Sequence, residues 1–227
     1  MHGVILAAGE GSRLGADGGN VPKAFIEVAG RTLYARQRRA LAPVIDDLTV
    51  VLGYNHERAA DCVGRANVVV VEDWAEFDNA ESLRLALERI DDHVLVCNGD
   101  VVVSRTAVTD VAARHDERGR SVVACLPGTE TEETAVRTEG GLVTDYGMMP
   151  GKRHAGLGIV DRRDVDTAAR VLRRHRDDWY PIVYPELRAR AVPIPPESHV
   201  EINRPEDVVA ARERFPLVFS GERNAHS

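Results

Sequence analysis

The feature that most constrains the fold of this 227-residue chain is its first apolar run together with the glycine-rich segment that follows it. Residues 4–15 read Val-Ile-Leu-Ala-Ala-Gly-Glu-Gly-Ser-Arg-Leu-Gly, and Pro22-Lys23 closes the segment. The branched residues predict a short buried strand. The glycines predict a loop with positive φ angles and accessible backbone N–H groups, beside the cations Arg13 and Lys23. Such a combination favours a polyphosphate ligand, whereas a glycine-rich loop alone is as typical of a tight turn.

Two common phosphate-binding loops are excluded by their spacing. The dinucleotide fingerprint requires a glycine three residues after its second glycine, and this chain has Leu14 there. The P-loop requires Gly-x4-Gly-Lys followed by serine or threonine. The only Gly-Lys pair is Gly151-Lys152, with Tyr146 at the first-glycine position and Arg153 at the hydroxyl position.

The segment resembles the signature of nucleotidyltransferases, Leu-Ala-Ala-Gly-x-Gly-x-Arg-Leu-Gly followed by a variable loop and Pro-Lys. The chain is similar here to the sugar-1-phosphate and phosphoalcohol nucleotidyltransferases, the superfamily that includes MobA-like NTP transferase domains. The resemblance implies a Rossmann-like, GT-A-like fold and transfer of a nucleoside monophosphate from an NTP to a phosphorylated acceptor. In that reaction Arg13 and Lys23 are the expected catalytic residues, because they would hold the phosphates and stabilise the transition state.

Apolar patterning predicts one α/β domain with a doubly wound, mostly parallel sheet. Several apolar runs lack alternation with polar residues, which favours parallel strands covered on both faces. They are residues 48–52, 68–71, 94–103 and 121–126. Helical segments alternate with them. We expect a single nucleotidyltransferase domain over 1–215, with a small antiparallel acceptor-side insertion at about 127–160 around Gly140-Gly141, and a flexible tail at 216–227.

Composition narrows the class of partner. A net charge of −7 lacks the electrostatic footprint of a nucleic-acid-binding protein. No apolar run approaches the ~20 residues of a membrane span, and the immediate strand predicts no signal peptide. Cys62, Cys97 and Cys125 lie within or beside apolar runs, which predicts reduced core residues in a cytoplasmic protein. The expected partners are an NTP and a phosphorylated small molecule.

The resemblance assigns nucleotide binding to residues from three segments. They are Leu6, Ala7, Ala8, Gly9 and Gly11 in the loop, Asn79 and Ser82 in the polar segment 73–82, and Asn98 at the end of an apolar run. An amide and a hydroxyl can supply the fixed donors and acceptors that a base edge requires. The Asn/Ser-Leu pattern resembles that of phosphocholine-type cytidylyltransferases, which favours CTP. The alternative for 73–82 is an ordinary loop with a helix cap.

Three oxygen-bearing residues are the candidates for a magnesium site. Asp100 ends a central apolar run, and ligands bind at such strand ends in open α/β sheets. The resemblance implies that Asp100 binds Mg²⁺. The alternative is a simple turn, because Asn-Gly-Asp is a sequence that favours turns. Residues 199–208 resemble the closing motif Glu-Ile-Asp/Asn-x-Pro-Glu-Asp-Leu. Glu201 and Asn203 are therefore the remaining candidate ligands, and Asn203 could instead cap the helix that follows.

The acceptor side is less defined by the sequence. Lys152 is one of only two lysines and lies in the basic segment 150–154, which predicts a mobile loop that binds the acceptor phosphate or, alternatively, a solvated turn. The aromatic, proline-bounded segment 179–185 is expected to line the acceptor pocket or to form the contact of a homodimer.

The resulting expectation is transfer of a nucleoside monophosphate, with CTP favoured, to a phosphorylated sugar, polyol or alcohol, with Mg²⁺ as cofactor and pyrophosphate as the second product. Two alternatives stay open. One is a MobA-like guanylyltransferase that acts on a pterin cofactor. The other is a non-catalytic nucleotide-sensing regulatory subunit, against which the joint presence of Arg13, Lys23 and Asp100 argues.

Overall fold

A nine-stranded mixed sheet forms the centre of the computed structural model, which describes residues 1–11, 22–128 and 132–216. The spatial order is β5 (Asn67–Val70), β4 (Asp47–Leu52), β1 (His2–Ala7), β6 (Val94–Asn98), β11 (Lys152–Val160), β8 (Val122–Leu126), β12 (Arg190–Pro193), β10 (Leu142–Met149) and β9 (Glu132–Glu139). The first four strands run parallel, as do β8 and β12. β11 lies antiparallel between β6 and β8, and β9 and β10 form an antiparallel hairpin.

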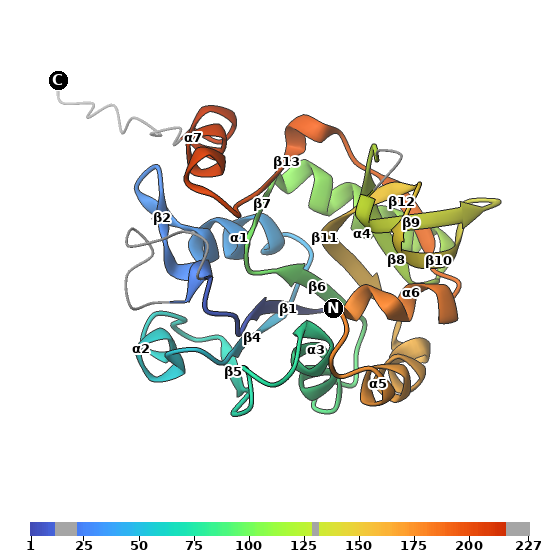
Figure 1. Cartoon of the computed structure of the whole chain (residues 1–227), viewed down its shortest axis with the longest axis horizontal. Coiled ribbons are helices and arrows are strands. Elements are labelled where there is room, and N and C mark those ends of the chain that lie inside the picture. The colour runs from blue at the N-terminus through green and yellow to red at the C-terminus, as the bar shows by residue number, and fades with distance from the viewer. Residues whose placement is uncertain (12–21, 129–131, 217–227) are drawn as a thin grey trace, which may run out of the picture.

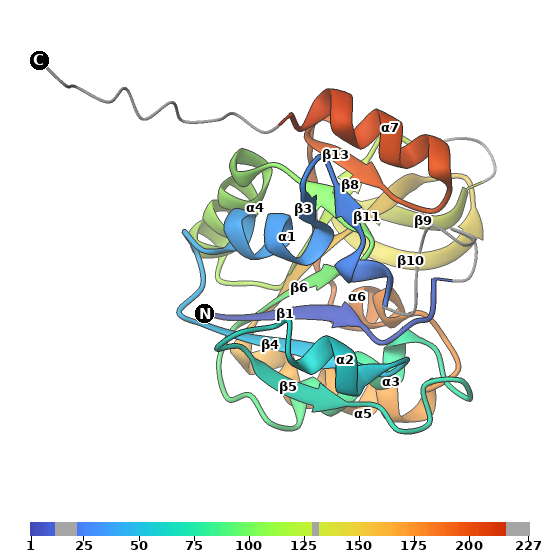
Figure 2. The ribbon, with the colours of Figure 1, turned by 90° about the vertical axis from the view of Figure 1, so that its left-hand side faces the viewer.

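Helices cover both faces of the sheet, as Figures 1 and 2 show. One layer contains α3 (Asn79–Leu87), α5 (Val165–Arg174) and α6 (Val183–Glu186), and the other contains α1 (Leu33–Leu41), α2 (His56–Ala60) and α4 (Arg105–Arg118). Neighbouring side chains of a strand point to opposite faces, so Val4 and Leu6 pack against the first layer and Ile5 against the second. The predicted doubly wound α/β class is confirmed.

A second, two-stranded sheet joins distant parts of the chain. β7 (Val101–Val103) pairs antiparallel with β13 (His199–Glu201), which precedes α7 (Pro205–Arg214). Val102, Val200 and Ile202 share a buried cluster with the α7 residue Ala211. This cluster anchors the closing motif on β7, and Figure 2 shows β13 and α7 next to each other.

The apolar run 94–103 forms two strands, separated by the Asn-Gly-Asp turn that the sequence offers as an alternative. β6 ends at Asn98, the chain turns at Gly99-Asp100, and β7 begins at Val101. The Gly99 N–H still donates to the Leu6 carbonyl at 2.8 Å. A Cβ on Gly99 would lie 2.5 Å from that carbonyl, so glycine is required for this close approach. Asp100 therefore sits at the carboxyl end of a central strand, as expected.

The acceptor-side segment agrees with the sequence only in part. The hairpin of β9 and β10 around Gly140-Gly141 is confirmed, and both glycines have positive φ. The predicted mobile loop 150–154 instead contains the start of β11. Residues 155–160, predicted as a further ribbon, are the buried part of that strand in the main sheet. A continuous apolar run suits a central strand with both faces covered.

The remaining short elements complete the description. They are the hairpin β2 (Glu27–Val28) and β3 (Arg31–Thr32) and the 3₁₀ helices η2 (Lys23–Phe25), η3 (Arg162–Asp164), η4 (Tyr180–Ile182) and η5 (Pro196–Ser198). Cys97 and Cys125 are buried as predicted, whereas Cys62 is exposed, which corrects its assignment to the core. None of the helices that the structure describes has the length and apolar character needed to cross a bilayer. The predicted tail lies outside the described residues from position 217 onward.

Candidate active site

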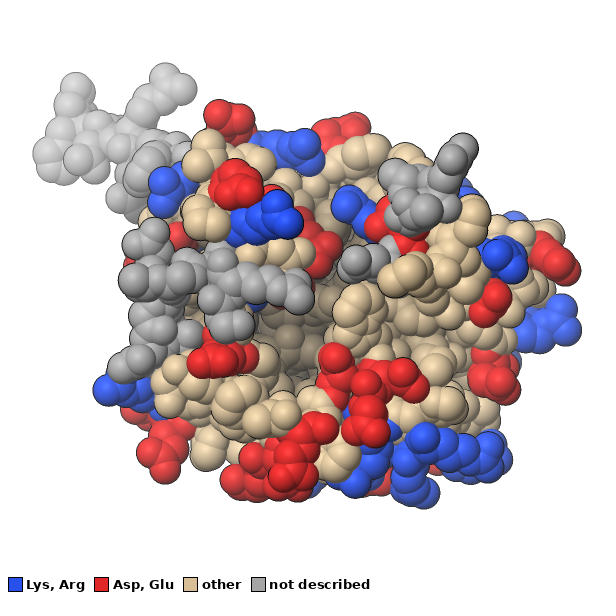
Figure 3. Space-filling model, viewed as in Figure 1, with Lys and Arg blue, Asp and Glu red and all other residues tan. Residues whose placement is uncertain are grey.

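A cleft of about 890 Å³ opens beside the carboxyl ends of β1 and β6. Figure 3 shows it as a hollow near the centre of this face, with acidic side chains along its rim. The cleft brings together most of the residues that the sequence nominates. They are Leu6, Ala7, Ala8, Gly9, Gly11, Lys23, Asn79, Ser82, Asn98, Asp100, Glu201 and Asn203. Lys152 is not among the lining residues, and Arg13 lies outside the described residues.

The glycine loop after β1 approaches Lys23 closely. Gly11 has a φ of +71°, and a Cβ placed on it would lie 2.7 Å from the Cβ of Lys23. Glycine therefore provides both the left-handed backbone and the space for the lysine stem. Pro22 and the 3₁₀ helix η2 then direct Lys23 into the cleft, where its side chain is 16% exposed.

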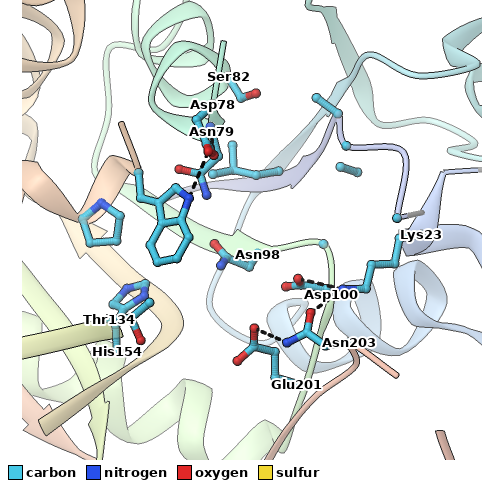
Figure 4. Close-up of a pocket in the computed structure, with 18 of the residues that line it drawn as sticks. Lys23, Asp78, Asn79, Ser82, Asn98, Asp100, Thr134, His154, Glu201 and Asn203 are labelled. Carbon is cyan, nitrogen blue, oxygen red and sulfur yellow. Dashed lines mark hydrogen bonds and ion pairs between the residues drawn. The ribbon is translucent and has the colours of Figure 1, made fainter. Parts of the chain in front are cut away.

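Lys23 links the beginning, the middle and the end of the chain. Its Nζ donates to Asn203 Oδ1 at 2.8 Å and to Asp100 Oδ2 at 3.1 Å. The Nδ2 of Asn203 in turn donates to Glu201 Oε1 at 2.8 Å. Figure 4 shows these four side chains converging on one side of the cleft. The sequence predicts the two acidic residues and the amide as a set, and the structure adds their contact with the catalytic lysine candidate.

The Asp100–Glu201–Asn203 group fits a hard divalent cation. Asp100 Oδ1 is buried and has no hydrogen-bond partner within the described part of the chain. Burial raises the pKa of Glu201, and the nearby Asp100 charge raises it further, against the Asn203 hydrogen bond and the Lys23 and Arg153 charges. Two neighbouring carboxylates and an amide oxygen are the oxygen donors that Mg²⁺ prefers.

The closing helix does not use Asn203 as its cap. Asp207 Oδ2 accepts the N–H groups of Asn203 at 2.8 Å and of Arg204 at 2.7 Å. This arrangement corrects the alternative in which Asn203 caps α7. The amide of Asn203 is left to face Lys23 and Glu201.

The opposite wall is built around the first turn of α3. Asp78, and not Asn79 or Ser82, caps this helix, because Asp78 Oδ1 accepts the Asn79 N–H at 2.7 Å. Asp78 Oδ2 also accepts from Trp179 Nε1 at 3.0 Å, and Asn79 Oδ1 accepts the Tyr180 N–H at 2.7 Å. The aromatic segment is thereby docked on α3, and Trp179 lines the cleft.

Several lining residues were missed by the sequence analysis. Tyr146, Thr134 and Arg153 come from β10, β9 and β11, and His154 lies next to Arg153. Burial lowers the pKa of His154 to about 3, so this ring is neutral at physiological pH. Its Nδ1 accepts the Gly156 N–H at 3.2 Å. The sequence signal for Arg153 was the basic pair Lys152-Arg153, of which only the lysine was predicted as a site residue.

Comparison with known proteins places this chain in a defined family. The model of the MobA-like NTP transferase domain matches residues 3–199. The CMP-5'-(3-aminopropyl)phosphonate synthase of Streptomyces rubellomurinus is 33% identical over 164 residues, which are 69% of this chain and 26% of that protein. The 2-C-methyl-D-erythritol 4-phosphate cytidylyltransferase of Deinococcus radiodurans is 48% identical over 65 residues, 29% of this chain and 26% of that protein. The chain thus spans about a quarter of the length of these relatives.

Solved structures share the fold over nearly the whole chain. The CTP:phosphocholine cytidylyltransferase of Streptococcus pneumoniae superposes with a TM-score of 0.76 at 21% identity, covering 93% of this chain and 97% of that one. The inositol-1-phosphate CTP transferase of T. maritima gives 0.72 at 17% identity, with 91% and 90% covered. At these identities the likeness concerns the fold.

Proposed function

This chain belongs to the family of MobA-like NTP transferase domains, and on that premise we propose that it transfers CMP from CTP to a small molecule bearing a phosphate or phosphonate group. The observation that carries the proposal is the convergence of the glycine loop, Lys23 and the Asp100–Glu201–Asn203 oxygen group in one cleft. CTP is favoured because several relatives and structural neighbours are cytidylyltransferases or CMP-conjugate synthases by name.

The reaction requires positioning and charge neutralisation more than a covalent intermediate. An oxygen of the acceptor oxyanion attacks the α-phosphorus of CTP and forms a new P–O bond. The bond from the α-phosphorus to the bridging oxygen breaks, and pyrophosphate leaves with that oxygen and the electron pair. Because an ionised phosphate or phosphonate already carries a lone pair on oxygen, no general base is needed.

The residues of the cleft, together with Arg13 of the sequence signature, divide this work. The backbone of residues 8–11 and Arg13 hold the β- and γ-phosphates, and Lys23 stabilises the charge that develops at the α-phosphoryl group. Asn79, Ser82 and Asn98 contact the nucleoside, with the exposed indole of Trp179 beside them. Asp100, Glu201 and Asn203 would hold Mg²⁺, which would supply positive charge to neutralise the phosphates.

A pyrophosphate-release assay tests the proposal. Purified protein is incubated with each of the four NTPs and with 3-aminopropylphosphonate, phosphocholine, inositol 1-phosphate or 2-C-methylerythritol 4-phosphate, in Mg²⁺ and in EDTA. We expect release that depends on CTP, Mg²⁺ and one acceptor, and a product that contains CMP joined to that acceptor by mass spectrometry. A pterin cofactor that carries a phosphate is included as a fifth acceptor, and release only with GTP and this pterin would favour the guanylyltransferase alternative. Binding of NTP without release in any combination would favour a nucleotide sensor.

A further inference from the structure

A second cation of the cleft, Arg153, lies on a different wall from Lys23. Arg153 is on β11, where it pairs with Leu126 of β8 and Ala135 of β9, and its side chain lines the cleft. Lys23 forms an ion pair with Asp100 at 3.1 Å, and Arg153 is a second cation in the lining of the same cleft.

One donor of the Arg153 guanidinium lacks an acceptor within the protein. Its Nε is buried without a hydrogen-bond partner, and no ion pair to Arg153 occurs among the described residues. A buried donor without an acceptor is unfavourable, and more so when it belongs to a charged group. An arginine in this state, in the wall of a ligand cleft, is suited to a group that supplies oxygen acceptors.

The neighbouring Lys152 differs in placement. Arg153 is one of the residues that line the cleft, and Lys152, one position earlier on β11, is not. The charge of Lys152 instead reaches the buried thiol of Cys125, where burial raises the pKa to about 12 and Lys152 opposes that rise.

We propose that Arg153 binds the phosphate or phosphonate group of the acceptor and so determines that this cleft accepts an oxyanion and not a neutral hydroxyl compound. This assignment rests on the proposed function. The planar guanidinium matches two oxygens of a tetrahedral oxyanion, which leaves the third oxygen available for attack. Arg153 lines the same cleft as the Asp100–Glu201–Asn203 group, so an oxyanion bound to Arg153 shares the cleft with the oxygen group assigned to Mg²⁺.

Steady-state kinetics of variants at positions 152 and 153 test the role of Arg153 in acceptor binding. Arg153→Gln, Arg153→Lys and Lys152→Gln are compared with Arg137→Gln, which removes an exposed arginine of β9 outside the cleft. We expect Arg153→Gln to raise the acceptor KM by about 10- to 100-fold while the CTP KM changes less than about threefold, with partial recovery in Arg153→Lys. An equal rise in both KM values, or an acceptor-specific rise in Lys152→Gln alone, would overturn the assignment.

A binding measurement separates this proposal from the proposed function. The nucleotide site is saturated with α,β-methylene-CTP and Mg²⁺, and methylphosphonate is titrated calorimetrically into wild type and the same variants. Methylphosphonate binding that Arg153→Gln abolishes supports the anion site even if no acceptor in the panel turns over. Equal binding by wild type and Arg153→Gln, with unchanged melting temperatures, would reject it even if the enzyme is an active cytidylyltransferase.

Discussion

At Lys23, one ammonium group contacts the same oxygens that we assign to the metal. Its Nζ lies 3.1 Å from Asp100 Oδ2 and 2.8 Å from Asn203 Oδ1. The positive charge of this ammonium opposes the binding of a divalent cation to the same residues. A nucleotide triphosphate supplies the alternative partner, because its phosphates attract the same ammonium.

Lys23→Met is accordingly expected to strengthen metal binding and to weaken catalysis. Without the competing ammonium, the affinity for Mn²⁺ in the absence of nucleotide should rise by about tenfold, as measured by electron paramagnetic resonance. Turnover of CTP should fall by roughly 100-fold or more, because the charge on the α-phosphoryl group loses its stabilising cation.

Lys152→Met is the matched comparison, since it removes the other lysine of the chain. Its Mn²⁺ affinity should equal that of wild type. Equal Mn²⁺ affinity in Lys23→Met and wild type would show that the ammonium does not compete with the cation.

The two carboxylates should contribute unequally to the metal requirement. Asp100→Asn is expected to abolish turnover, because Asp100 retains a buried oxygen without a partner in the described part of the chain. Glu201→Gln should reduce turnover less and raise the Mg²⁺ concentration needed for half-maximal activity, since an amide oxygen is a weaker ligand. Activity measured against Mg²⁺ concentration in both variants checks that Asp100 contributes more than Glu201. If Glu201→Gln needs the same Mg²⁺ concentration as wild type, Glu201 is not a ligand of the metal.

At the scale of elements, α3 is held in place by a buried acidic residue. Glu81 accepts hydrogen bonds from Arg84 Nε and Nη2 at 2.6 and 2.7 Å and from Arg176 Nε and Nη2 at 2.9 Å each. Arg176 follows α5 and also stacks on the Phe77 ring at 3.6 Å. These contacts fix α3, the helix that carries Asn79 and Ser82, to the segment that follows α5.

Glu81→Gln should destabilise the protein by about 2–4 kcal/mol, because it leaves two arginines without their carboxylate. The Arg84 hydrogen bonds hold the pKa of Glu81 at about 2, below its ordinary 4.5. The stabilisation is therefore complete above pH 4.5 and is lost as the pH falls through about 2. Urea unfolding at several pH values should show the difference from wild type shrinking below about pH 4.

Glu88→Gln on the same helix is the control. Glu88 also pairs with two arginines, Arg84 and Arg173, but its side chain is 35% exposed. An exposed pair is worth about 1 kcal/mol or less, so Glu88→Gln should unfold nearly as wild type does. A loss as large as that of Glu81→Gln would mean that burial is not what makes the Glu81 contacts strong.

At the scale of the whole molecule, the site depends on how the chain closes. β13 brings the closing motif to β7, and Ile202 N–H donates to the Asp100 carbonyl at 2.8 Å. Lys23 and Asn203 are 180 residues apart in the sequence, and their side chains form a direct hydrogen bond. A ligand that binds at this site should therefore stabilise segments that are far apart in the sequence at the same time.

Hydrogen exchange should reveal this coupling. Addition of CTP and Mg²⁺ is expected to slow amide exchange in three segments at once, read by mass spectrometry. They are residues 22–25, 98–101 and 199–203. Helix α5, which does not line the cleft, should exchange at an unchanged rate. Protection confined to the first segment would contradict a site shared with the closing motif.

The sequence by itself determined the features that rest on local chemistry. The buried strand, the glycine loop, Pro22-Lys23 and the hairpin at Gly140-Gly141 are visible because φ preferences and apolar patterning act over a few residues. The α/β class follows from the alternation of such segments. Asp100 could also be placed, because the end of a central strand is a local boundary.

Only the tertiary structure decided which polar groups meet. The position of β11 between β6 and β8 places Arg153, and not Lys152, in the lining of the cleft. The sequence alone does not show which of two adjacent cations lies in a cleft. The pairing of β13 with β7 places Asn203 on Lys23, while Asp207 takes the capping hydrogen bonds. Such contacts depend on sheet order and register between segments far apart in the chain, which no local preference specifies.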